Sequence, residues 1–137
     1  MTPTEKLMQK VIHAATGEIV HDPADVRRRY LDLGEDPETE DARHDAEAGI
    51  RGCGVPTGLP CDYSRHYESK AVAAEMLDGS WVGWTYWYGG GKHGEPSGIP
   101  WMEDAYEVET TVVMKPVREF KKVETTLPAE QEVKPNG

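Results

Sequence analysis

The chain has 137 residues, 37% of them apolar, and a formal net charge of −10. This length suits one domain with a modest core, and the negative charge disfavours direct binding of nucleic acid through neutralised phosphates. No apolar run reaches the length of a membrane span, and the first residues lack the apolar core of a signal peptide. We therefore expect a cytoplasmic protein with no membrane partner.

The first third of the chain predicts two helices within residues 3–33. Thr2 and Glu5 form a capping-box pattern around a proline, and the apolar residues that follow recur at helical spacing until Gly17. Asp22 precedes a second proline and starts a second helix, which Gly34 ends. The predicted inner faces of the two helices comprise Leu7, Met8, Val11, Ile12, Ala15, Val26, Tyr30 and Leu33.

The acidity of the chain is concentrated in residues 32–48. This segment holds eight carboxylates and one arginine, a net charge of −7, which leaves −3 for the other 120 residues. Its composition fits either a mobile acidic loop or a solvated helix. Such a segment keeps a protein soluble, and it also suits a partner with a basic surface, including as a mimic of nucleic-acid phosphates.

The second half of the chain predicts a β-hairpin. Residues 49–62 are rich in Gly and Pro and form a linking loop. Ser69–Leu77 and Ser80–Tyr88 then flank Asp78–Gly79, which suits a two-residue type I′ turn. Because both faces of the second strand are apolar, we expect that strand either to be central or to have its second face covered. The turn predicts four pairs: Met76 opposite Trp81, Ala73 opposite Trp84, Val72 opposite Thr85, and Ala71 opposite Tyr86.

A glycine-rich loop at residues 89–98 leads to the last predicted strand. Ala105–Met114 alternates between apolar and polar residues, and Pro116 interrupts it. Val117, Phe120 and Val123 are predicted to continue it briefly. The fold class is therefore α+β, with two N-terminal helices packed on a three- to four-stranded antiparallel sheet at residues 65–123. Residues 1–123 form one domain, and residues 124–137 form a flexible polar tail.

The cysteines and histidines do not predict a metal site. Cys53 and Cys61 are eight residues apart, His66 follows, and His44 or His93 would have to complete a ligand set. Structural zinc sites draw their ligands in tight pairs such as Cys-x-x-Cys, and no such pair occurs here. We expect neither a metal nor a cofactor.

The glycine-rich loop leaves a second function open. Successive glycines beside Lys92 can form an anion-binding nest, although His93 stands where a phosphate-binding loop has Ser or Thr. No local arrangement ties a nucleophile to a base, so we assign no catalytic residue. The alternative to a binding protein is a small-ligand-binding protein or an enzyme that uses this loop with Lys92, His93 and Glu95.

The aromatic run Trp81–Tyr88 is the most specific feature of the chain. One thin core needs about half of its rings, so the others are predicted to form an exposed patch with Trp101. Exposed Trp and Tyr residues are typical anchors of protein interfaces. The predicted binding surface consists of Trp87, Tyr88, Lys92, His93, Glu95 and Trp101.

Three stretches, Arg51–Pro60, Arg65–Lys70 and Gly79–Pro96, resemble a small family of proteins associated with bacteriophages and prophages of proteobacteria, for which no activity is known. The resemblance implies a phage context and the cytoplasm of a host bacterium. With the aromatic patch, it predicts a non-enzymatic accessory protein that binds a host or phage protein, as a modulator or inhibitor of a host system such as a defence pathway.

Overall fold

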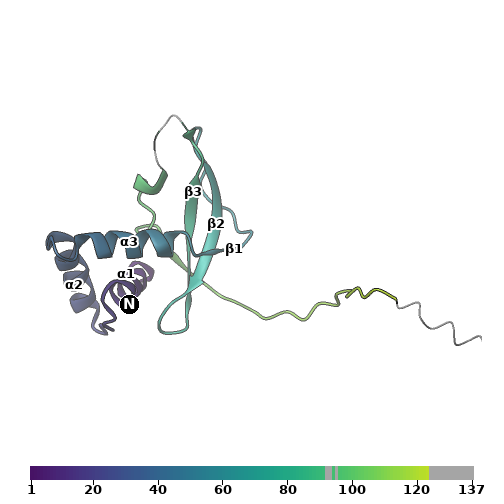
Figure 1. Ribbon diagram of the computed structural model, residues 1–137, viewed down its shortest axis with the longest axis horizontal. Coiled ribbons are helices and arrows are strands. Elements are labelled where there is room, and N and C mark those ends of the chain that lie inside the picture. The colour runs from purple at the N-terminus through teal and green to yellow at the C-terminus, as the bar shows by residue number, and fades with distance from the viewer. Residues whose placement is uncertain (92–93, 95, 124–137) are drawn as a thin grey trace, which may run out of the picture.

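The computed structural model describes residues 1–91, 94 and 96–123 and has an α+β fold, as predicted (Figure 1). Three helices come first: α1 (Pro3–Thr16), α2 (Pro23–Glu35) and α3 (Glu40–Arg51). An antiparallel sheet in the order β1-β2-β3-β4 follows. Its strands are β1 (Val55–Pro56), β2 (Glu68–Glu75), β3 (Trp81–Tyr88) and β4 (Tyr106–Val108), and a short 3₁₀ helix, η2 (Pro96–Gly98), precedes β4.

The starts of the first two helices and the end of α1 confirm the capping predictions, whereas α2 passes the predicted end at Gly34 and finishes at Glu35, with Asp36 as its C-cap. The Thr2 hydroxyl accepts a hydrogen bond from the Glu5 amide at 3.1 Å, and the Glu5 carboxylate accepts one from the Thr2 amide at 2.9 Å. Gly17 ends α1 with a φ of 83°, and the Asp22 carboxylate caps the first turn of α2. These local hydrogen bonds satisfy amides that have no partner within the helix.

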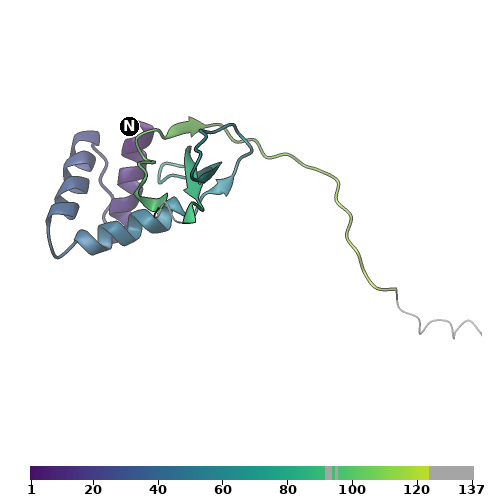
Figure 2. The same cartoon turned by 90° about the horizontal axis from the view of Figure 1, so that it is seen from above.

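The acidic segment is helical rather than a loop. Its second half forms α3, which crosses α1 at a large angle (Figure 2), and Ile50 near its end is buried in the core. The loop predicted at 49–62 is therefore shorter than expected, because α3 continues to Arg51 and Val55–Pro56 pairs with β2. Burial of Ile50 stabilises the last turn of α3. The charged residues earlier in the segment do not indicate this contact.

The predicted hairpin is present, but its turn is different. The Met76 carbonyl accepts from the Gly79 amide at 3.0 Å, and the Met76 amide donates to the Ser80 carbonyl at 2.7 Å. The connection therefore has three residues, with Gly79 at a φ of 85°, and the predicted two-residue type I′ turn is wrong. Asp-Gly also suits this longer turn, in which only the glycine needs a positive φ.

The longer turn shifts the predicted register by one residue. The four predicted pairs are wrong. The observed pairs include Ala71 with Thr85, Val72 with Trp84, Ala73 with Gly83, and Glu75 with Trp81. A shift of one residue changes which side chains of β2 and β3 share a face. Val72 and Trp84 thus lie together on the side of the helices.

The core lies between the helices and the inner face of the sheet (Figure 2). Val82 and Trp84 on β3 are completely buried and belong to one cluster with Leu7 of α1 and Ile50 of α3. Trp101 joins this cluster, and its ring centroid lies 5.2 Å from that of Trp84. As predicted, β3 is a central strand, with β2 on one side and β4 on the other.

The last predicted strand is much shorter than Ala105–Met114. β4 ends at Val108, which pairs with Trp81, the first residue of β3, so the chain beyond has no strand to pair with. Residues 109–123, here called the arm, run away from the rest of the protein (Figure 1). The predicted continuation at Val117, Phe120 and Val123 is wrong, because residues 109–123 form no strand, and all three side chains are exposed. The predicted tail, 124–137, lies outside the described residues.

Candidate functional site

The structure describes three of the six residues of the predicted binding surface, and these three differ in exposure. Trp87 and Tyr88 are partly exposed at the end of β3, and Lys92, His93 and Glu95 lie outside the described residues. Trp101 is only 7% exposed. The expectation that Trp101 forms an exposed anchor is therefore wrong, because its indole packs on Trp84 in the core.

Two tyrosines at the end of β3 form a cluster with two cations. Tyr86 and Tyr88 point to the same face of the strand, and their rings stack with centroids 5.9 Å apart. The Arg51 guanidinium lies 4.6 Å from the Tyr86 centroid, and the Lys70 ammonium lies 5.7 Å from both rings. We call Arg51, Lys70, Tyr86 and Tyr88 the cation–aromatic cluster.

Arg51 is held in place from several directions. Its Nη2 donates a short hydrogen bond to the Trp87 carbonyl, and its own carbonyl accepts from the Trp84 indole at 3.3 Å. Its Nε is buried without an acceptor among the described residues. The two hydrogen bonds position this arginine, and within the described residues its Nε lacks the acceptor that a buried donor needs.

A pocket of about 350 Å³ opens beside the cluster. Arg51 and the end of β3 form one part of its wall, and the glycine-rich loop and η2 form the rest. The lining residues are Arg51, Tyr86, Trp87, Tyr88, Gly89, Gly91, Gly94, Pro96 and Ser97. The structure thus brings the predicted aromatic end and glycine-rich loop together, and it adds Arg51, which no local pattern in the sequence indicates.

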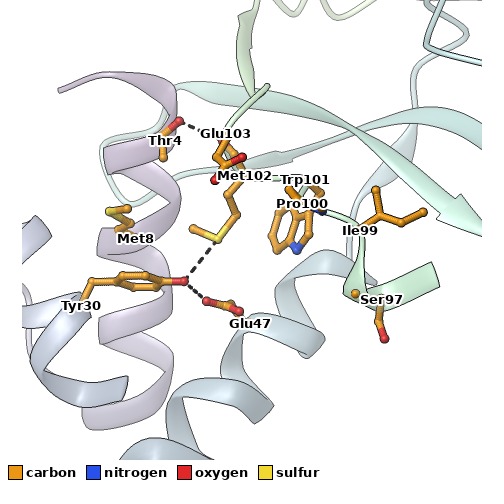
Figure 3. Close-up of a pocket in the computed structure, with 11 residues that line it drawn as sticks. Thr4, Met8, Tyr30, Glu47, Ser97, Ile99, Pro100, Trp101, Met102 and Glu103 are labelled. Atoms are coloured by element: carbon orange, nitrogen blue, oxygen red, sulfur yellow. Dashed lines mark hydrogen bonds between the residues drawn. The ribbon is translucent and has the colours of Figure 1, made fainter. Parts of the chain in front are cut away.

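A second pocket, of about 280 Å³, lies between the helices and the segment before β4 (Figure 3). The Tyr30 hydroxyl donates a short hydrogen bond to the Glu47 carboxylate, and it also lies 3.7 Å from the Met102 sulfur. Burial raises the pKa of Glu47. Across the pocket, the Thr4 hydroxyl donates to the Met102 carbonyl at 2.9 Å.

The polar groups of the second pocket interact with one another and with α2 and α3. The Glu47 carboxylate already accepts from Tyr30 and lies 4.0 Å from the Arg43 guanidinium, which also stacks on the Tyr30 ring at 4.2 Å. Among the described residues, no histidine or cysteine lines this pocket. These contacts join α2 to α3, so Tyr30 and Glu47 have a structural role here.

The sequence candidates for metal binding that the structure describes are not brought together; His93 lies outside the described residues. Cys53 and Cys61 are exposed free thiols, and in the part of the chain that the structure describes no group of three or more His, Cys, Asp or Glu side chains could hold a metal ion. None of the helices within the same residues has the length and apolar composition needed to cross a membrane.

Compared with protein-family models, curated proteins and solved structures, the chain shows no match.

Proposed function

We propose that the protein is a non-enzymatic binding module that recognises a protein partner through the cation–aromatic cluster. The observation that carries this proposal is the stack of Tyr86 and Tyr88, with Arg51 over the Tyr86 ring and Lys70 near both rings, beside a pocket of about 350 Å³. The cluster concentrates positive charge in a chain whose net charge is −10.

The chemistry of the cluster favours a partner segment that presents a carboxylate beside an apolar or aromatic group. Tyrosine rings supply contact area at a low cost in side-chain entropy, and Tyr and Arg are enriched among residues that dominate binding energy. The Nε of Arg51 has no acceptor among the described residues, so a carboxylate in the pocket would supply one after a small adjustment of the side chain.

The resemblance to phage- and prophage-associated proteins supports the biological part of the proposal. The partner is then a host or phage protein, and the module modulates or inhibits a host system in the cytoplasm of the bacterium. Inhibition requires only that the cluster occupy a surface that the partner needs for its own interactions. It requires no chemical reaction at the site.

A second candidate function uses the acidic segment. The helical conformation of α3 holds several carboxylates, including Glu40 and Asp41, in a fixed array, and a mimic of nucleic-acid phosphates needs such an array. In this case a basic groove of the partner would bind α3, and the cation–aromatic cluster would play no part.

The alternative of a small-ligand-binding protein or enzyme places a ligand in the same pocket. The glycine-rich loop contributes Gly89, Gly91 and Gly94 to its wall, and an anion would interact with Arg51 there. The roles predicted for Lys92, His93 and Glu95 fall on residues that the structure does not describe. A small ligand would remain bound in dialysed protein or compete with the partner, which separates this alternative from protein binding alone.

Capture of partners from a bacterial lysate tests the main proposal. The full chain is expected to retain a protein that the Tyr88→Ala and Lys70→Glu variants do not retain. If each residue is an anchor, each substitution weakens the affinity for that protein about thirty-fold. Leu31→Ala removes an exposed apolar side chain on α2 and serves as the control. Equal retention by all four proteins, with native circular dichroism, would show that the cluster is not the binding site.

A further inference from the structure

The arm exposes an unusual amount of apolar surface. Each of its large apolar side chains is between 63% and 91% exposed; they are Val112, Val113, Met114, Val117, Phe120 and Val123. Large solvent-exposed apolar patches mark interaction sites. Here the exposed apolar side chains follow one another along an extended segment of 15 residues. The arm also differs from the rest of the protein in charge.

The charges of the arm and of the preceding residues are opposite. The arm carries four basic and two acidic residues, a net charge of +2, whereas residues 1–108 carry ten basic and twenty acidic residues, a net charge of −10. An arm that docks on the acidic part of a second copy is therefore attracted to it. Two copies without their arms would repel each other.

An apolar groove lies on the outer face of the sheet, opposite the helices. Val55, Ala73, Trp81 and Val108 come from the four strands, and their pairing register places them on one face. The groove has a volume of about 530 Å³, and the remaining lining residues are Pro56, Thr57, Leu59, Glu109, Thr110 and Thr111. Val55 is 52% exposed and Leu59 is 43% exposed, so this surface is only partly covered.

We propose that the arm of one copy docks in the outer-face groove of a second copy, and that the exchange is reciprocal. The first residues of the arm, 109–111, lie at the edge of the groove, so a two-fold axis near this edge places each arm beside the other copy's groove. Val108 points to the outer face, and the alternation of an extended chain gives Val112 and Met114 the same direction. Fully extended, the arm reaches about 50 Å.

The proposal is independent of the proposed function, because Tyr86 and Tyr88 lie on the other face of the sheet. The tyrosines share the face of Trp84, whereas the groove contains Trp81. Variants of the arm and the groove therefore leave the cation–aromatic cluster intact.

Sedimentation velocity of the full chain over a wide concentration range tests the exchange. Wild-type protein is expected to dimerise. An arm variant, Val112→Asp with Met114→Asp, and a groove variant, Val55→Asp with Leu59→Asp, are each expected to dimerise at least about thirty-fold more weakly. Mixing the two variants should recover association, because one supplies an intact groove and the other an intact arm. Leu31→Asp, at an exposed site on α2, should dimerise as wild type does.

Three results would overturn the exchange. The first is a wild-type protein that stays monomeric at every concentration, as it would if each arm occupied its own groove. The second is an arm variant that dimerises normally; this variant changes no residue of the helices or the sheet, so misfolding would not obscure the result. The third is a mixture of the two variants that stays monomeric while both keep native circular dichroism.

Discussion

The two faces of the sheet are similarly apolar but differ in what covers them. On the inner face, Val82 and Trp84 are completely buried under α1 and α3. On the outer face, Trp81 is only partly buried, and Val55 of β1 is half exposed. Neighbouring residues of one strand thus serve different purposes. The comparison shows that an apolar strand predicts a sheet, whereas burial depends on whether distant elements pack on each face.

The largest expected effect compares two tryptophans of β3. Trp84→Ala should lower the free energy of unfolding by about 3–5 kcal/mol, because it empties the centre of the core. Trp81→Ala, on the outer face, should cost less than half as much. Denaturation with urea, at a concentration where the protein is monomeric, measures both. Equal losses would mean that the two faces are equally buried and that the comparison fails.

Trp101→Ala should behave like Trp84→Ala rather than like a surface variant. Its indole packs against Trp84 in the core, so the main effect of this substitution is expected on stability, although the sequence predicted Trp101 to be an exposed part of the binding surface. The sequence could not show this, because the contact joins residues on either side of the glycine-rich loop. Arg51 was missed for the same reason: its partners Tyr86 and Trp87 are more than thirty residues away.

The hairpin turn decides which side chains of β2 share a face with Trp84. Gly79 has a φ of 85°, which a β-branched residue strongly resists, so Gly79→Val should cost about 1–3 kcal/mol. Thermal unfolding followed by circular dichroism checks this. An unchanged melting temperature would argue that the turn adopts another conformation and that the register needs revision.

Local patterns predicted the elements that are stabilised locally. Thr2, Glu5 and Asp22 mark helix starts because their caps involve residues two or three positions away. The predicted register of the hairpin was wrong because Asp-Gly fits turns of two lengths. The predicted length of β4 was wrong because the alternation in Ala105–Met114 does not reveal where its partner strand, β3, begins. For the binding surface, only the aromatic end of β3 and the glycine-rich loop could be anticipated.

Gly83 allows a ring of the outer face to approach the backbone of β3. A Cβ at this position would lie 2.8 Å from the Tyr106 ring, so Gly83→Ala should cost about 1–3 kcal/mol through overpacking. Gly49→Ala is the matched control, because a Cβ there meets nothing within 4 Å and a helix gains up to about 1 kcal/mol from this change. Urea denaturation of both variants should therefore give shifts of opposite sign.

The smallest expected effect concerns acid stability. Hydrogen bonds from Ser80, with the Lys6 ammonium 3.3 Å away, lower the pKa of Asp78 to about 2. Ionised Asp78 therefore stabilises the fold above about pH 4, and this contribution is lost as the pH falls towards 2. Because Asp78 is half exposed, Asp78→Asn should remove less than about 1 kcal/mol at pH 7. Urea titrations at pH 7 and pH 3 should show a smaller difference from wild type at the lower pH, and a larger one there would contradict this.

The most direct test of the proposed function measures partner binding by two variants side by side. Tyr88→Ala alters the cation–aromatic cluster, and the triple variant Glu38→Gln, Glu40→Gln, Asp41→Asn removes charge from the acidic segment. With the captured partner as ligand, calorimetry is expected to show that Tyr88→Ala binds about thirty-fold more weakly while the triple variant binds as wild type does. If the triple variant loses binding and Tyr88→Ala retains it, the site lies at the start of α3 and the turn before it, and the central proposal is wrong.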